Sequence, residues 1–306
     1  MSQRPGPETG VLIRPMRPED LVSAERITAD SYLQADLEYA ARSPVPTRRT
    51  EVGGQRWRER TAHLLASDPQ GCWVAERDAE LVGVVVSFRR ELMWLLASFA
   101  VAPHAQGNGV GTRLLERAVE YGSGCLRGMF NSSADPAALR RYRRAGFDLQ
   151  PYCMATGTID RARFPDDLTR ILGSIRAGDA ADRHLLDSLD RRTRGAAHGP
   201  DHEVLAKQHP LIVCDRLDAQ GYAYLGADGS PAVLAATDRR TATRLLWGCL
   251  ATAQDGSQVR IDRISAANQW ALDVALDAGL AIGQHGFLAL RRLTPPAPYL
   301  PHASLM

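Results

Sequence analysis

Hydrophobic and polar positions along the first half of the chain predict an alternation of strands and helices. Short apolar runs separated by turn residues predict strands at 11–14, 71–76, 81–88, 91–101, 126–131 and 152–159. Apolar residues at helical spacing predict one helix that begins at Pro18 and others that include 57–65, 112–121 and 136–144. The order is β-α-α-β-β-β-α-β-α-β, and its three consecutive strands indicate an antiparallel meander.

The second half of the chain repeats this order. Segment 126–148 aligns without gaps to 259–281, and the helix at 112–115 matches 243–246. Both matches occur in the same order, which predicts an internal duplication. We therefore expect a disordered tail over 1–10, one domain over 11–159, a second domain over 160–294 and an extended tail over 295–306.

Composition limits the functions that are open to this chain. Its 306 residues allow one large domain or two medium ones, and a net charge of +2 leaves neither half with the basic excess of a nucleic-acid binder. No apolar run reaches the ~18 residues of a membrane-spanning helix, and the N-terminus lacks the apolar core of a signal peptide. We expect a cytoplasmic protein, a monomer or homodimer, with neither nucleic acid nor membrane as a partner.

A glycine-rich loop is the most informative motif. Gly107, Gly109 and Gly111 follow a predicted strand and open a predicted helix, so the backbone can turn tightly and leave its amides unobstructed. Such amides at a helix N-terminus form an anion site that suits a pyrophosphate. A P-loop would need a lysine here, and a dinucleotide-binding loop would stand at the start of a parallel sheet rather than after a meander.

The loop, in the form Gln106-x-x-Gly109-x-Gly111 after the strand end Val101-Ala102-Pro103, resembles the acetyl-coenzyme A loop of the GNAT superfamily of N-acetyltransferases. The resemblance extends over residues 11–155 and includes Tyr142-Arg143-Arg144-Ala145-Gly146-Phe147, which is similar to the family's Y-x-x-x-G-F ending. It implies an α/β (α+β) fold of two tandem GNAT-like domains. Each would be a mixed, mostly antiparallel sheet flanked by helices.

The resemblance implies acetyl-CoA as co-substrate and no metal. The residues that would contact this co-substrate are Phe99, Ala100, Val101, Gln106, Gly107, Asn108, Gly109, Val110, Gly111, Thr112, Asn131, Asp135 and Tyr142. Asp135 stands where the family more often has asparagine, and its alternative role is to cap the following helix.

The family's mechanism is direct attack of an amine on the thioester, without a covalent intermediate. The resemblance implies a backbone N–H near Val101 as the oxyanion donor and Tyr142 as the general acid for the leaving thiolate. An unperturbed tyrosine, with a pKa near 10, is protonated at pH 7 and able to donate. The alternative for Tyr142 is an aromatic ring packed against the sheet.

The general base has no clear candidate. Many family members carry a glutamate on the fourth strand, where this chain has Leu95 and Leu96. Glu91 is a tentative base that would act through water, with a plain surface charge as the alternative. Asp30, Asp36 and Glu38 lie where family members bind the acceptor, and are tentative partners for a cationic amine.

The second half lacks the chemical motifs of the first. The loop positions from Gln106 to Gly111 fall on Thr237, Asp238, Arg239, Arg240, Thr241 and Ala242, and Tyr142 falls on Ala275. We expect a degenerate, inactive GNAT domain. His198 and His202 have the spacing of helical zinc ligands, but Gly199-Pro200 disfavours a helix and no third ligand is evident, so we expect a loop without metal.

These observations favour an N-acetyltransferase that transfers an acetyl group from acetyl-CoA to a primary amine of a small molecule, with its active site in the N-terminal domain. Two alternatives remain. One is acetylation of a protein N-terminus or lysine side chain. The other is a non-catalytic acyl-CoA-binding sensor, which is suggested by the missing carboxylate on the fourth strand.

Overall fold

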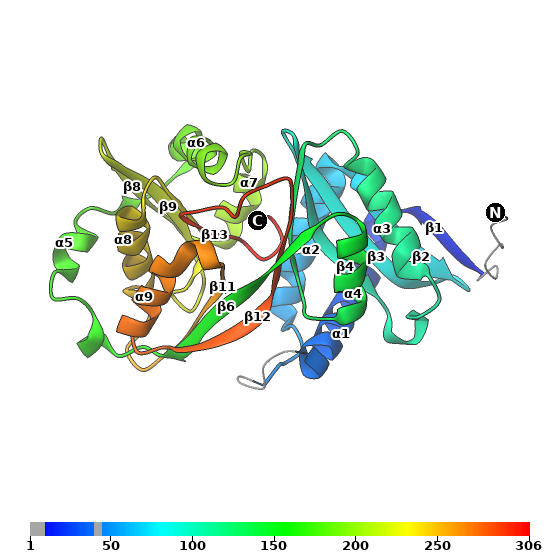
Figure 1. Ribbon diagram of the computed structural model, residues 1–306, viewed down its shortest axis with the longest axis horizontal. Helices are drawn as coiled ribbons and strands as arrows, with labels where there is room; N and C mark the ends of the chain where they lie inside the picture. Colours follow the sequence, from blue (N-terminus) through cyan, green and yellow to red (C-terminus); the bar gives the residue numbers. More distant parts are fainter. Residues whose placement is uncertain (1–9, 40–44) are drawn as a thin grey trace. The chain divides into compact units, whose positions relative to one another are not determined.

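The computed structural model describes residues 10–39 and 45–306 (Figure 1). Helices combined with mostly antiparallel strands confirm the predicted α/β (α+β) class. The described residues form two compact units: unit 1 holds 10–38, 45–89 and 96–125, and unit 2 holds 39, 90–95 and 126–306. Most of the tail predicted over 1–10 lies outside the described residues. No helix in the described ranges is both long enough and apolar enough to cross a membrane.

Unit 1 contains the predicted meander. It holds all or most of β1 (Val11–Pro15), α1 (Leu21–Tyr39), α2 (Glu51–Ser67), β2 (Cys72–Arg77), β3 (Glu80–Arg90), β4 (Met93–Val101) and α3 (Val110–Tyr121), while the ends of α1 and β3 and the first residues of β4 belong to unit 2. They form a sheet in the order β1-β2-β3-β4, in which β1 and β2 are antiparallel, as are β2 and β3. Helix α3 contacts β1 and β2, and it buries Leu114, Leu115 and Ala118 on one face.

Unit 2 is larger. Its helices are α4 (Pro136–Arg144), α5 (Leu168–Leu172), α6 (Arg183–Thr193), α7 (Asp201–Gln208), α8 (Arg239–Leu250) and α9 (Gln269–Asp277). Its strands are β5 (Arg127–Ser132), β6 (Asp148–Thr158), β7 (Arg176–Ala177), β8 (Leu211–Arg216), β9 (Ala219–Leu225), β10 (Pro231–Ala236), β11 (Gln258–Ile264), β12 (Ala281–Arg291) and β13 (Tyr299–Leu300). Five of these strands form an antiparallel sheet in the order β13-β10-β9-β8-β7.

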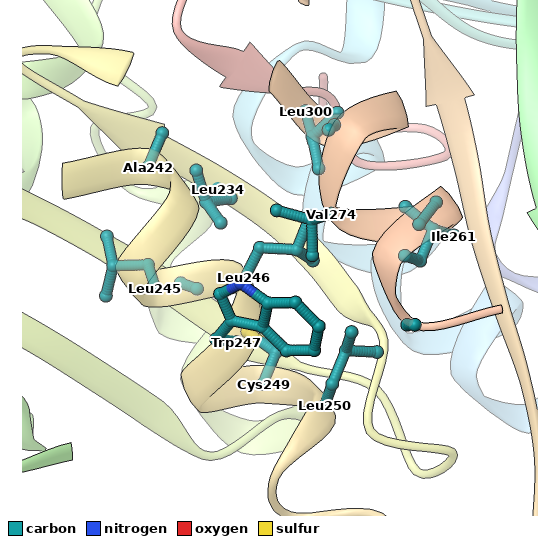
Figure 2. Packing of buried hydrophobic residues seen from close by; sticks show 14 of the residues in the cluster. Leu234, Ala242, Leu245, Leu246, Trp247, Cys249, Leu250, Ile261, Val274 and Leu300 are labelled. Atoms are coloured by element: carbon teal, nitrogen blue, oxygen red, sulfur yellow. The ribbon is translucent and has the colours of Figure 1, made fainter. Parts of the chain in front are cut away.

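The core of unit 2 lies around α8. Leu245, Leu246 and Trp247 of this helix pack with Leu234 of β10 and Val274 of α9 (Figure 2). All are buried, and each removes apolar surface from water, which stabilises the fold by about 25 cal/mol per Å².

The same junction between strand and helix occurs in both halves of the chain. The guanidinium of Arg14 donates to both oxygens of Asp20, at 2.8 and 2.9 Å, and that of Arg176 donates to both oxygens of Asp182, at 2.9 and 2.5 Å. Each aspartate also accepts the backbone N–H three residues before it. The repeated junction supports a duplication.

The halves exchange strands within unit 2. Strand β12, from the second half, pairs antiparallel with β5 and also with β6, so it lies between two strands of the first half. Strand β6 in turn pairs with β11 of the second half. The strand pairs of unit 2 therefore cross the boundary that was predicted between a domain over 11–159 and a domain over 160–294. Strand pairing joins residues far apart in sequence, and the local pattern carries no information on which strands will pair.

Candidate active site

The two halves of strand β4 differ in their pairing. Its first residues form a parallel ladder with β5, in which Met93, Trp94 and Leu95 pair with Arg127, Gly128 and Met129, and the ladder ends there. From Leu96 to Val101 the strand is held on its other side, where the N–H of Ala102 donates to the carbonyl of Val82 in β3. In the part of the chain that the structure describes, no strand pairs with the last part of β4 on the side away from β3.

The predicted oxyanion donor lies on this edge of β4. The carbonyl of Val101 accepts bonds from the hydroxyl of Ser31 and the amide of Gln106, both at 3.0 Å, and the N–H of Phe99 donates to the hydroxyl of Tyr32 at 3.2 Å. In a strand the N–H and C=O of one residue point the same way, and alternate residues share a side. The N–H groups of Phe99 and Val101 thus both face away from β3.

Helix α1 supplies residues to this edge that the sequence did not single out. Ser31 and Tyr32 come from α1, and Trp57 of α2 donates from its indole nitrogen to the hydroxyl of Ser98 on β4 at 3.1 Å. Burial raises the pKa of Tyr32, so its hydroxyl stays protonated at neutral pH. The sequence could not predict these hydrogen bonds, because a polar residue among the apolar positions of a helix does not show which distant residue it will contact.

The glycine loop has the conformation that its glycines predict. Gly107 and Gly109 have φ of 84° and 77°, in the left-handed region, and both are exposed. A Cβ at either position would meet no atom of the described chain within 4 Å, so backbone conformation rather than packing requires glycine there. Gly109 is the N-cap of α3, and it has no side chain to cover the first amides of that helix. These amides can therefore receive an anion.

The corresponding helix end in the second half is occupied by the chain itself. Asp238 caps α8: its carboxylate accepts the backbone N–H of Thr241 at 2.9 Å and the hydroxyl of Thr241 at 2.7 Å. Burial alone would raise the pKa of Asp238, but these bonds and one from Thr237 lower it. A carboxylate thus lies where a phosphate would have to bind.

The edge of β10, the strand that precedes α8, is also paired with another strand. Leu300 and Tyr299 of β13 pair with Leu234 and Ala235 of β10, the strand that leads into α8 as β4 leads into α3. Strand β13, in the predicted extended tail, thus pairs with the edge of β10 that corresponds to the edge of β4 on which the described residues show no strand.

Replacing Asp238 by alanine is expected to lower the free energy of unfolding by about 1 kcal/mol at pH 7, because the cap of α8 is lost. The folded-state pKa of Asp238 is lowered, so its stabilisation is present at neutral pH and disappears as the pH falls through that pKa, below about 4. Urea unfolding of both proteins at pH 7 and pH 3 measures this. An equal difference at both pH values would contradict the capping role.

Comparison with known proteins settles the family. Residues 35–147 match the profile of the Acetyltransferase (GNAT) family. An "Uncharacterized N-acetyltransferase" from Archaeoglobus fulgidus is 32% identical over 117 residues, which are 36% of this chain and 71% of that relative. The chain belongs to the GNAT family. It is therefore an acyltransferase.

Two solved structures show that the GNAT-related fold extends over the whole chain. A putative acetyltransferase from Pyrococcus horikoshii matches 100% of this chain and 98% of its own, with a TM-score of 0.70 and 16% identity. A GCN5-related N-acetyltransferase from Kribbella flavida matches 91% of this chain and 70% of its own, with a TM-score of 0.57 and 16% identity. At these identities the likeness concerns the fold alone.

Three other residues of the predicted GNAT site lie in unit 2. Tyr142 is on α4 with 5% of its surface exposed, and its ring packs edge-on against Phe130 with the centroids 4.6 Å apart. Asp135 caps α4 by accepting the N–H of Ala137 at 2.8 Å. The amide nitrogen of Asn131 donates to the carbonyls of His302 and Ala303, at 3.0 and 3.1 Å. The roles of all three toward coenzyme A stay predictions.

Glu91 lies in a setting that does not support its tentative role as base. It occupies the turn between β3 and β4 with φ of 52°, and its carboxylate accepts the Nε of Arg191 at 2.6 Å. Strand β4, with nine residues, follows it and spans about 30 Å before the strand ends at Val101. Glu91 is better described as the surface charge that was its alternative, and we do not retain it as a base.

The tentative acceptor residues lie on α1. Asp30 and Glu38 line one depression of about 480 Å³ together with Leu33, Gln34 and Leu37, whereas Asp36 is not part of its lining. Asp30 forms an ion pair with the Nε of Arg48 at 2.7 Å, and both side chains are about half exposed. The depression thus offers carboxylates beside leucine side chains.

The segment around His198 matches the expected loop in part. Residues 194–200 lie outside any helix, as expected, but α7 begins at Asp201, so His202 lies in a helix. A third candidate ligand, which the sequence did not reveal, is present: Asp190, His198 and His202 converge, and one ligand atom from each lies within 4.8 Å of the others.

Proposed function

We propose that the protein transfers the acetyl group of acetyl-CoA to a primary amine of a small molecule, and that its active site lies in the first half of the chain. The observation that carries this proposal is the contrast between the halves. In the described residues of the first half, no side chain caps the loop amides and no strand pairs with the end of β4, whereas Asp238 and β13 occupy the corresponding positions in the second. The pyrophosphate would bind the amides at the start of α3, with the thioester along this edge of β4.

The proposed reaction needs few protein groups. The amine nitrogen attacks the thioester carbonyl, a C–N bond forms, the C–S bond breaks, and the oxyanion between these steps accepts a hydrogen bond from the N–H of Val101. Tyr142 gives its proton to the leaving thiolate, on the resemblance of its motif to that of the family. Strand β4 carries buried leucines at 95 and 96, so the amine loses its proton to water.

The acceptor proposed for this reaction is a cationic amine with an apolar part. Asp30 and Glu38 would attract the charge, and Leu33 and Leu37 would contact the apolar part in the depression on α1.

Calorimetric titration with acetyl-CoA, followed by an assay of thiol release with a panel of primary amines, tests this proposal. We expect one binding site per chain and release of coenzyme A that depends on the amine. Binding without release across the panel would instead favour the acyl-CoA sensor, and release only with peptides would favour a protein substrate.

Changing Tyr142 to phenylalanine is expected to lower kcat about 30-fold, less than most general acids contribute, because a thiolate is a stable leaving group. The ring that packs against Phe130 is retained, so acetyl-CoA should bind as in the wild type. Steady-state kinetics and calorimetry measure the two effects. An unchanged kcat would remove Tyr142 from the proposed mechanism.

A further inference from the structure

A buried cluster of nitrogen and oxygen donors lies in unit 2, and the acetyl transfer does not use it. Asp190 comes from α6, His198 precedes α7, His202 lies in α7, and Tyr222 comes from β9. The exposed fraction of these side chains is 3% or less. Burying so many polar groups costs free energy unless each finds a partner, so the arrangement needs a physical reason.

The donor atoms lie close to the spacing around a tetrahedral zinc ion. Oδ2 of Asp190 is 2.7 Å from Nδ1 of His198 and 3.2 Å from Nε2 of His202. The hydroxyl of Tyr222 is 2.5 Å from Oδ1 of Asp190 and 3.5 Å from Nδ1 of His198. Tetrahedral zinc with bonds near 2.0–2.2 Å sets its ligand atoms about 3.3 Å apart, so small side-chain shifts would admit the ion.

The chemistry of the donors suits a zinc ion. Imidazole nitrogens, a carboxylate and a phenol oxygen are ligands that zinc accepts.

Surrounding contacts hold the donors in place. Nδ1 of His202 lies 3.2 Å from the hydroxyl of Tyr224, which can accept its proton when Nε2 binds a metal. The buried guanidinium of Arg194 donates to the carbonyls of Ala196 and Ala197, and so fixes the turn that leads to His198. The site is therefore built before any ion enters.

We propose that Asp190, His198, His202 and Tyr222 form a structural zinc site. All four coordination positions are filled by protein atoms, which is typical of structural rather than catalytic zinc. The ion joins α6, α7 and β9, and it stabilises unit 2 because it binds the folded chain only.

Tag-free full-length protein, stripped with a chelator and dialysed against zinc, tests this proposal by its metal content and melting temperature. We expect one zinc per chain, a higher melting temperature with zinc, and a visible absorption band when cobalt(II) replaces zinc. The variant His202→Ala should lose all three. The matched control is His184→Ala, an exposed histidine on the same α6, and it should keep them.

A milder variant covers the case in which His202→Ala fails to fold. Tyr224→Phe removes only the partner of His202 and should weaken zinc affinity about 10-fold. Folded wild-type protein that takes up no zinc, or the same zinc content in wild type and folded His202→Ala, would overturn the proposal. The cluster would then be a hydrogen-bonded network without metal.

Discussion

Replacing Gly109 by glutamate is expected to weaken acetyl-CoA binding about 100-fold, or nearly 3 kcal/mol. Gly109 caps α3 with φ of 77°, and open space lies where its side chain would project. A carboxylate at this helix end would compete with the pyrophosphate for the amides and repel its charge, as Asp238 does in the second half. Calorimetric titration of the folded variant with acetyl-CoA measures the loss.

The chain contains a matched control for this substitution. Gly256 also has φ of 77°, and a Cβ there would likewise meet no atom of the described chain within 4 Å. Gly256→Glu therefore introduces the same charge and the same left-handed strain, which costs about 1–2 kcal/mol of stability, but at a turn of the second half. It should bind acetyl-CoA as the wild type does. Equal affinity in both variants would exclude the loop as the pyrophosphate site.

Local features of the fold were predictable because each has a local cause. Helix α4 was predicted at its observed bounds, since Pro136 suits a first helical turn and Gly146, with φ of 84°, suits a left-handed end. The left-handed turns at Gly107 and Gly109 were likewise expected from residue type alone. In the candidate site, the role of Val101 follows from the resemblance to the GNAT family rather than from residue type.

Features that depend on distant residues were not predictable from one sequence. Strand β12 alternates apolar and polar positions like any half-buried strand, and this pattern does not say that β5 and β6 will flank it. The contact of Tyr32 with Phe99 joins residues 67 positions apart. Asp190 meets His198 and His202 only because α6 and α7 pack together, so the spacing of the histidines alone could not reveal a third ligand.

Replacing Asp201 by asparagine is expected to lower the free energy of unfolding by about 3–5 kcal/mol. Asp201 is fully buried, and both its oxygens accept from the guanidinium of Arg90, which is 6% exposed. The asparagine keeps the shape but removes the charge, so the buried guanidinium of Arg90 loses the negative charge of this partner where water cannot replace it. Urea unfolding followed by circular dichroism measures the change.

An exposed ion pair serves as a control that distinguishes burial from ion pairing as the cause of the expected loss of stability. Arg143 and Asp148 form an ion pair at 2.5 Å with side chains 56% and 79% exposed, and Asp148→Asn should change stability by less than about 1 kcal/mol. The double variant Arg90→Met with Asp201→Leu should recover much of the loss, because no charge then remains buried. If Asp201→Asn cost no more than Asp148→Asn, the cost could not come from desolvation of Arg90. The Arg90–Asp201 ion pair would then contribute no more to the free energy of unfolding than an exposed ion pair does.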